Sequence, residues 1–313
     1  MKLSAVVSQY VAHKRSLGMR FSAEEFILRA FCKTLGDGLI SSIEAESVLA
    51  FLNGNGPVTN TWVKKYHVLC GFYRFALARG LVIRSPLPRS IPRRSVPAFV
   101  PYIYSHAELR RLIDAVPAAC GGRVPVDDYV LRALLLLLYG AGLRISEALS
   151  LTVGDVDLRQ ACLRVRDTKF YKTRLVPLGS DLGRVLTDYL GKRNASHAAT
   201  TDAPFFCFRD GAPLSQSAAG NAFRRLRAAA GVVRDGGARH QPRIHDLRHS
   251  SAVHRLVAWY RSGIDLHELL PKLATYLGHV NLSATQHYLT MTPELLHEAS
   301  LRFEHYALEN DHD

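Results

Sequence analysis

The chain has 313 residues, of which 48% are hydrophobic and 21% are charged. That length exceeds what one ordinary core accommodates and that composition excludes a disordered or fibrous chain, so we expect a globular protein with two domains. The 40 lysines and arginines exceed the 27 aspartates and glutamates by 13, a balance that favours a polyanionic partner such as nucleic acid.

The positive charge is concentrated near the amino terminus. Residues 1–97 hold 14 of the basic side chains but only 5 of the acidic ones, so this third of the chain carries nine of the 13 net charges. A module that binds a phosphate backbone shows such asymmetry, because each cation placed on a phosphate releases counterions. A basic surface without a specific partner is the simpler alternative.

Neither the cysteines nor the apolar segments indicate export or a membrane. The five cysteines stand far apart without a Cys-x-x-Cys pair, so we expect neither a zinc site nor a disulfide framework. The first residues lack the apolar core of a signal peptide. The most apolar run, residues 131–143, is shorter than the roughly 20 residues that span a bilayer. We therefore expect a cytoplasmic protein that contacts no membrane.

The first domain, residues 1–90, is predicted to be a small helical bundle. Apolar residues recur at helical spacing over 24–35, 41–52 and 59–79, and Ser22 and Glu25 have the spacing of a capping box. The aromatic residues of the third helix are best explained as core. The basic residues of that helix are candidates for DNA backbone contacts: Lys64, Lys65, Arg74 and Arg79.

A linker separates the two domains. Residues 84–97 contain four prolines and four arginines and show no amphipathic period. Proline removes backbone donors and disfavours helix in the residue before it, so an extended segment is expected. We place the linker at residues 91–100, and Arg93 and Arg94 within this stretch are further candidates for DNA contacts.

The second domain, residues 101–313, is predicted to be mainly helical with a small antiparallel β-sheet. Ser105 and Glu108 form a second capping-box pattern, and alternation over 162–166 and 174–177 predicts two strands joined by a turn around Lys169. Further helices are expected over these ranges: 105–116, 126–139, 181–192, 215–230, 246–262, 266–277 and 293–307.

Four short motifs in this domain carry chemistry. Cutting a DNA phosphodiester without metal requires a nucleophile, cations on the non-bridging oxygens and a proton for the departing 5′ oxygen. The side chains suited to these tasks occur in Gly142-Leu143-Arg144-Ile145-Ser146-Glu147, in the turn at Lys169, in Ile244-His245-Asp246-Leu247-Arg248-His249, and in Leu277-Gly278-His279 followed nine residues later by Tyr288.

In this order the motifs resemble those of the tyrosine recombinase, or phage integrase, family over roughly residues 100–300. The resemblance implies the DNA breaking-rejoining enzyme fold, with a helical, SAM-like core-binding domain ahead of the catalytic domain. It implies an integrase or transposase type of activity that cuts and rejoins DNA through a 3′-phosphotyrosyl intermediate, without metal, ATP or other cofactor. A transposon-borne or recombinase-in-trio member fits best.

The resemblance also assigns roles to individual residues. Arg144 and Arg248 would hold the scissile phosphate through planar, paired donors. His245 and His279 would donate to its oxygens or manage the proton of the nucleophile, Tyr288.

Other residues would assist in the same reaction. Lys169 would protonate the leaving 5′ oxygen, with Lys172 as the second choice for that role and a further DNA contact. Glu147 and His249 would support the arginines.

The partners implied are double-stranded DNA and three further copies of the chain, in a tetramer around two duplexes. In relatives a carboxy-terminal helix docks on the neighbouring subunit, and residues 293–307 are the counterpart here; packing on its own domain is an equal alternative for this helix.

Two other functions remain open from the sequence. An inert family member would bind DNA as an accessory factor without cutting it. A metal-dependent phosphohydrolase would use His245 and Asp246 with other histidines, although Arg248 lies inside that motif and no second acidic cluster accompanies it.

Overall fold

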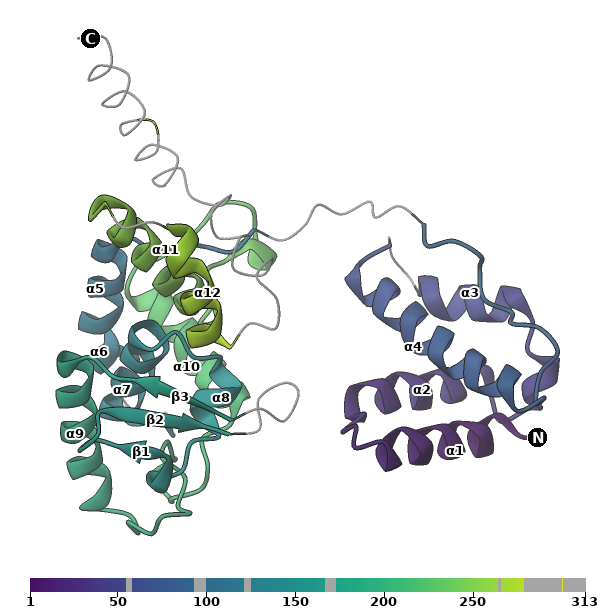
Figure 1. Ribbon diagram of the computed structural model, residues 1–313, viewed down its shortest axis with the longest axis horizontal. Coiled ribbons are helices and arrows are strands. Elements are labelled where there is room, and N and C mark those ends of the chain that lie inside the picture. The colour runs from purple at the N-terminus through teal and green to yellow at the C-terminus, as the bar shows by residue number, and fades with distance from the viewer. Residues whose placement is uncertain are drawn as a thin grey trace. The chain divides into compact units, whose positions relative to one another are not determined.

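The computed structural model describes residues 1–54, 58–92, 100–120, 125–166, 173–263 and 266–278, together with Ser300. The chain divides into two compact units, Met1–Phe99 and Val100–Asp313, which are described separately below. Both units are mainly helical (Figure 1). Within the described ranges, no helix has the length and apolarity that crossing a membrane requires.

The first unit is built from helices. Helix α1 was not predicted, although its buried residues Leu3, Val6, Val7, Tyr10 and Val11 recur at helical spacing. The second predicted helix begins later than expected because a 3-10 turn precedes it. The elements are α1 (Leu3–Ser16), α2 (Ser22–Leu35), the turn η1 (Ile40–Ser42), α3 (Ala45–Asn53) and α4 (Asn60–Ala78).

The aromatic side chains of α4 form much of the core of this unit. Trp62, Phe72 and Tyr73 are each at most 2% exposed and pack among apolar residues of α1, α2 and α3. Tyr10 of α1 contacts Phe72 edge to face. The prediction that these aromatic residues belong to the core is confirmed.

The capping box predicted at Ser22 and Glu25 is wrong. Ser22 is the first helical residue rather than the cap, because the helix starts after Phe21, which has a left-handed backbone with φ 50°. The carboxylate of Glu25 is bound by Arg15 and Arg29 instead of the helix start. Residues 84–92 form neither helix nor strand, in agreement with the predicted extended segment, and Pro88 accepts a hydrogen bond from the Tyr66 hydroxyl on α4.

The second unit combines helices with one small sheet, as predicted. The elements in chain order are α5 (His106–Asp114), α6 (Val116–Ala119), α7 (Asp128–Gly140), α8 (Ile145–Leu149), η2 (Val153–Asp155), β1 (Val156–Asp157), β2 (Cys162–Val165), β3 (Arg174–Pro177), α9 (Ser180–Asn194), α10 (Gln216–Ala229), η3 (Ala238–His240), α11 (Asp246–Arg261) and α12 (Leu266–Leu277). The capping box of Ser105 and Glu108 is present at α5. The expectation of a mainly helical fold with a small antiparallel sheet is confirmed.

The sheet has the order β1-β2-β3 with antiparallel neighbours. Leu163 pairs with Val156 on one side and with Val176 on the other, so three buried apolar residues line one face. Side chains of paired residues lie on the same face of a sheet, and Arg174 pairs with the buried Val165. Arg174 therefore lies on the inward face, whereas Leu175 is 64% exposed.

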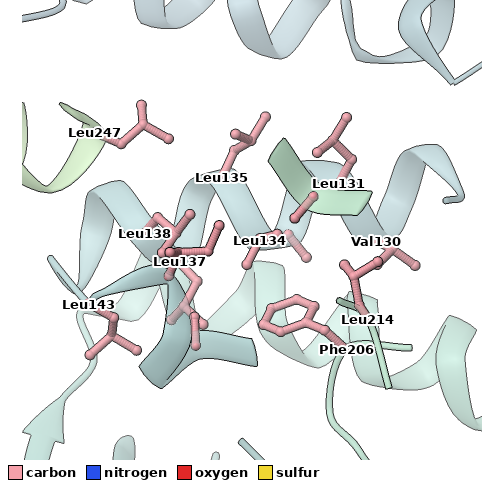
Figure 2. Packing of buried hydrophobic residues seen from close by; sticks show 14 of the residues in the cluster. Val130, Leu131, Leu134, Leu135, Leu137, Leu138, Leu143, Phe206, Leu214 and Leu247 are labelled. Carbon is pink, nitrogen blue, oxygen red and sulfur yellow. The ribbon is translucent and has the colours of Figure 1, made fainter. Parts of the chain in front are cut away.

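Helix α7 runs through the main core of this unit. Its leucines lie on opposite sides of the helix and approach Leu143, Phe206, Leu214 and Leu247 from other elements (Figure 2). A helix that is apolar around most of its circumference is stable only when buried on most sides. Helix α7 therefore packs against two of the predicted motifs, through Leu143 of the first motif and Leu247 of the third.

Helices α11 and α12 form a second, smaller apolar cluster that includes Leu256, Leu273 and Leu277. The first residues of this unit are bound to α11 and to the segment before it. The Tyr104 amide donates to the Ser250 hydroxyl, and the Tyr104 hydroxyl donates to the Arg243 carbonyl. The start of α11, which carries the third motif, is thus held from several sides.

Candidate active site

Arg144 occupies the turn between α7 and α8. It precedes the first residue of α8, and Gly142 allows the turn with φ +61°, where an added Cβ would lie 2.8 Å from Leu277 Cδ2. The Arg144 side chain is 29% exposed and donates from Nη1 to Glu147 Oε1 at 2.7 Å and from Nη2 to the Gly278 carbonyl at 3.0 Å. It is held firmly but retains an accessible edge.

Glu147 is the buried centre of the site. Its side chain is 6% exposed, and its carboxylate also accepts the backbone N–H of Arg144 at 3.0 Å. Burial raises the pKa of this carboxyl, but hydrogen bonds and charge from Arg174, together with hydrogen bonds from Arg144, outweigh burial and lower the pKa to about 2. Glu147 is therefore an anion under all ordinary conditions.

Arg174 is the principal residue of this site that the sequence interpretation missed. Its side chain is 12% exposed, with Nη1 3.1 Å from Glu147 Oε1 and Nη2 2.8 Å from Glu147 Oε2. Its Nε donates to the Tyr276 carbonyl at 3.2 Å. The signal available in the sequence was an arginine on the inward face of a predicted strand, a position that apolar residues usually fill.

Arg248 lies near the start of α11 and is 3% exposed. Its Nη1 donates to the Gly142 carbonyl at 2.6 Å and its Nη2 donates to the Leu277 carbonyl at 2.7 Å. Glu147 Oε2 lies 3.9 Å from Nη1. Arg144 and Arg248, 104 positions apart in the sequence, thus share one carboxylate and one end of a helix.

Three consecutive backbone carbonyls, the last two of α12 and that of the residue after it, each accept a hydrogen bond from a different arginine. Arg174 binds the carbonyl of Tyr276, Arg248 that of Leu277, and Arg144 that of Gly278. Helix ends leave carbonyls without intrahelical partners and carry partial negative charge, so cations there are favourable. The chain reaches His279 one residue later.

The two histidines of the third motif flank this cluster. His245 precedes α11, and its ring lies 5.1 Å from that of His249, nearly perpendicular to it. Burial lowers the pKa of His245, and the positive charges of Arg248, Arg243 and Arg144 lower it further against the opposite effect of Asp246. Burial, followed by the charge of His245, lowers the pKa of His249 to about 4. Both imidazoles are neutral near pH 7.

The residues that a phosphohydrolase would require are engaged elsewhere. Asp246 is fully buried and binds Arg243 Nη2 at 2.9 Å. His254 stacks on His106, with ring centroids 4.3 Å apart, and its Nδ1 lies 2.8 Å from the Tyr139 hydroxyl. In the part of the chain that the structure describes, no three histidine, cysteine or acidic side chains form a group suited to a metal ion.

Several predicted residues lie outside the described ranges. These are Lys169 and Lys172 of the hairpin turn, Arg93 and Arg94 of the linker, His279, Tyr288 and, apart from Ser300, the helix expected over 293–307. The structure therefore brings together Arg144, Glu147, His245, Arg248 and His249 from the predicted set.

The basic residues of α4 have different surroundings from one another. Lys64 and Arg74 are exposed. Lys65 donates to the Phe51 carbonyl at 2.8 Å and lies over the ring of that residue, and Arg79 lies 3.8 Å from the centre of the Phe75 ring. Lys64 and Arg74 thus present the freer charges to solvent.

Comparison with known proteins places the geometry in a family. Residues 104–294 match the model of the phage integrase family. The integrase/recombinase y4rE of Sinorhizobium fredii is 35% identical over 302 residues, which cover 96% of this chain and 95% of that protein. The tyrosine recombinase XerD of Corynebacterium glutamicum is 32% identical over 228 residues, covering 73% of this chain and 69% of that protein.

Solved structures share the fold. The Tn1549 transposon integrase in complex with transposon right end DNA has a TM-score of 0.69 at 16% identity, covering 98% of this chain and 100% of that chain. The lambda integrase tetramer bound to a Holliday junction has a TM-score of 0.65 at 19% identity, covering 92% and 77%. With the family model matching over half of the sequence, the chain belongs to the phage integrase family, the tyrosine recombinases.

Proposed function

We propose that the protein is a site-specific DNA recombinase of the integrase or transposase type, in which Arg144 and Arg248 bind the scissile phosphate and Tyr288 attacks it. The observation that carries this assignment is the meeting of the two guanidiniums at Glu147 and at the last carbonyls of α12. Three sequence motifs that are far apart in the chain are joined by these contacts. The closing motif continues from that helix end to Tyr288.

The guanidiniums are prepared for a dianionic transition state. Their positions are fixed by Glu147 and by backbone carbonyls before any substrate arrives, so little reorganisation is needed when charge develops on the phosphate. The accessible edge of Arg144 offers planar donors that a lysine does not provide. One positioned donor of this kind contributes about 10² to 10³ in rate.

In the proposed reaction, the Tyr288 hydroxyl oxygen forms a bond to phosphorus and the bond from phosphorus to the 5′ oxygen breaks. The phenol releases its proton to solvent water, and the 5′ oxygen receives one from Lys169, leaving a 3′-phosphotyrosyl link and a free 5′ hydroxyl. The reverse attack by another 5′ hydroxyl joins a new strand. The bond energy is retained in the ester, so the cycle needs no ATP. The cationic side chains neutralise the phosphate in place of a metal ion.

His245 is suited to hydrogen bonding rather than to carrying charge. Its lowered pKa keeps the ring neutral near pH 7, so it can donate one hydrogen bond to a phosphate oxygen without adding a further cation to the three arginines around Glu147. We assign His279 a similar role and Glu147 and His249 supporting ones.

The proposed partner is double-stranded DNA. The first unit would contact the DNA backbone through Lys64 and Arg74, and its further candidates are Lys65, Arg79, Arg93 and Arg94. Lys172 is a candidate in the second unit. The excess positive charge of residues 1–97 supports this assignment. The tetrameric arrangement of lambda integrase on a Holliday junction supports a tetramer here, with residues 293–307 as the contact between subunits. Such a protein would be associated with the nucleoid while bound.

The test is covalent capture of DNA. Duplexes that tile the DNA flanking the encoding gene are nicked at random, so that some molecules carry a nick beside the cleavage site and lose the strand needed for religation. They are incubated with the protein in EDTA, denatured with detergent and resolved for protein-linked DNA. We expect an adduct with wild-type protein and none with Tyr288→Phe.

The other outcomes decide between the alternatives. Cutting that appears only when a divalent metal is added would replace the proposal with a phosphohydrolase. Binding to the duplexes without an adduct would identify an inert accessory factor. The same pool also gives the target sequence, because the captured strand ends at the cleavage position.

A further inference from the structure

The structure assigns Arg174 as a positioning residue for strand cleavage: it joins the hairpin that carries Lys169 to Glu147 and to the end of α12, and thereby sets the closing motif against the phosphate-binding arginines. This inference rests on the proposed recombinase activity and adds a residue to it.

All three nitrogens of the Arg174 guanidinium have hydrogen-bond acceptors within the protein. Two terminal nitrogens bind the two oxygens of Glu147, and Nε binds the Tyr276 carbonyl. The side chain is 12% exposed. Each of its three nitrogens therefore has an acceptor on another element of the fold, and the role of Arg174 follows from these acceptors.

The fit at the helix end is close. Gly278 has φ +68°, and a Cβ added there would lie 2.7 Å from Arg174 Nη1 and 2.9 Å from its Cζ. The glycine is thus required both by its backbone conformation and by the approach of the arginine. The Gly278 carbonyl is in turn bound by Arg144, so one residue lies between the two guanidiniums.

Loss of the Arg174 side chain would remove its contacts with Glu147 and with the end of α12 together. Glu147 would keep Arg144 as its close partner, because Arg248 lies 3.9 Å away. The end of α12 would keep two of its three arginine contacts. Tyr288 lies ten positions after Gly278, so a shift of this helix end moves the start of the segment that carries the nucleophile. A misplacement of about 1 Å costs on the order of 100-fold in rate.

The experiment compares three variants on the duplex captured by wild-type protein. Single-turnover cleavage is measured at saturating DNA, with affinity measured separately at two salt concentrations. For Arg174→Ala we expect a rate loss of about 100-fold, affinity within a factor of about 3 and an unchanged salt slope. Arg174→Lys keeps the charge but not the paired donors, and we expect a loss of about 10-fold.

Chemical rescue separates positioning from a general loss of structure. Guanidinium chloride at millimolar concentration, compared with sodium chloride at equal ionic strength, should restore part of the Arg174→Ala rate by occupying the vacated site. Arg184→Ala is the matched control, because it removes an arginine and its ion pair with Asp181 from the exposed face of α9. It should cleave like wild type with or without guanidinium.

The outcomes are distinct from those of the proposed function. If wild-type protein forms no adduct, the recombinase proposal fails. If wild-type protein forms one and Arg174→Ala cleaves at the same rate, or loses affinity with a smaller salt slope, the inference about Arg174 alone is overturned. If Arg174→Ala does not fold, Arg174→Lys decides: a normal rate overturns the inference and a reduced rate at full affinity supports it.

Discussion

The arginines around Glu147 and the basic residues of α4 carry positive charge in opposite ways. Arg144, Arg174 and Arg248 are largely or partly buried, and each has named acceptors on other elements of the fold. Lys64 and Arg74 are exposed on one helix. Charge of the first kind is fixed in direction and suits one phosphate, whereas charge of the second kind acts over a surface and is screened by salt.

The difference arises because burying a charged side chain costs free energy, whereas exposing one to solvent does not. An unpaired buried cation is expensive, so a buried arginine is tolerated only where a carboxylate and carbonyls receive its donors. An exposed lysine needs no partner and keeps its rotamer freedom. The same residue types therefore give a rigid site in one unit and a mobile charged surface in the other.

The largest effect is expected from Arg144→Ala. This variant removes the guanidinium with the accessible edge, and single-turnover cleavage of the captured duplex should fall by about 10² to 10³ while the melting temperature changes little. Arg184→Ala should retain the wild-type rate. Cleavage by Arg144→Ala within a factor of about 3 of wild type would show that the buried cations are not the phosphate site.

Glu147→Gln tests the stability of the same cluster. Removing the anion leaves buried guanidiniums without their carboxylate, which typically costs about 3 to 5 kcal/mol. We expect a lower melting temperature for the unit that contains residues 100–313, measured by calorimetry, and an unchanged transition for the other unit. A calorimetric trace identical to wild type would mean that the arginines hold their positions without Glu147.

The double variant Lys64→Gln, Arg74→Gln tests the exposed surface. Loss of two phosphate contacts should reduce the slope of log affinity against log salt by about 2 and weaken binding to every duplex alike. Titration at several salt concentrations by fluorescence anisotropy gives this slope. An unchanged slope would remove these two residues from the DNA-binding surface.

The smallest effect is expected from pH. Burial, before the other causes, lowers the pKa of His249 and of His254 to about 4, below the ordinary value of 6.5. The unfolded chain then binds more protons than the folded one between these values, so the stability that the neutral rings contribute is present above pH 6.5 and is lost as pH falls toward 4.

The melting temperature of the unit that contains residues 100–313 should therefore fall as the pH is lowered through this interval. The decrease should be less steep in His254→Gln, in which one of the two groups no longer titrates. An equal slope in that variant and in wild type would exclude His254 as a source of the effect.

The sequence alone determined the local features. Apolar periodicity located α4, α7, α11 and α12 within a few residues, and alternation located β2 and β3. The order of the motifs along the sequence indicated the family to which the chain belongs. Helix α1 was not predicted, although its buried apolar residues recur at helical spacing from Leu3 to Val11. The predicted cap at Ser22 is wrong because Glu25 binds two arginines instead of the helix start.

Only the tertiary structure decided which cations share an acceptor. Arg174 has no motif of its own, and its role comes from pairing opposite Val165 on the inward face of the sheet, where it reaches Glu147 and Tyr276. Likewise, Lys64 and Lys65 are neighbours in sequence, but Lys65 binds the Phe51 carbonyl. Spacing along the chain fixes the face a residue occupies within its own element, whereas contacts between elements depend on packing that brings distant segments together.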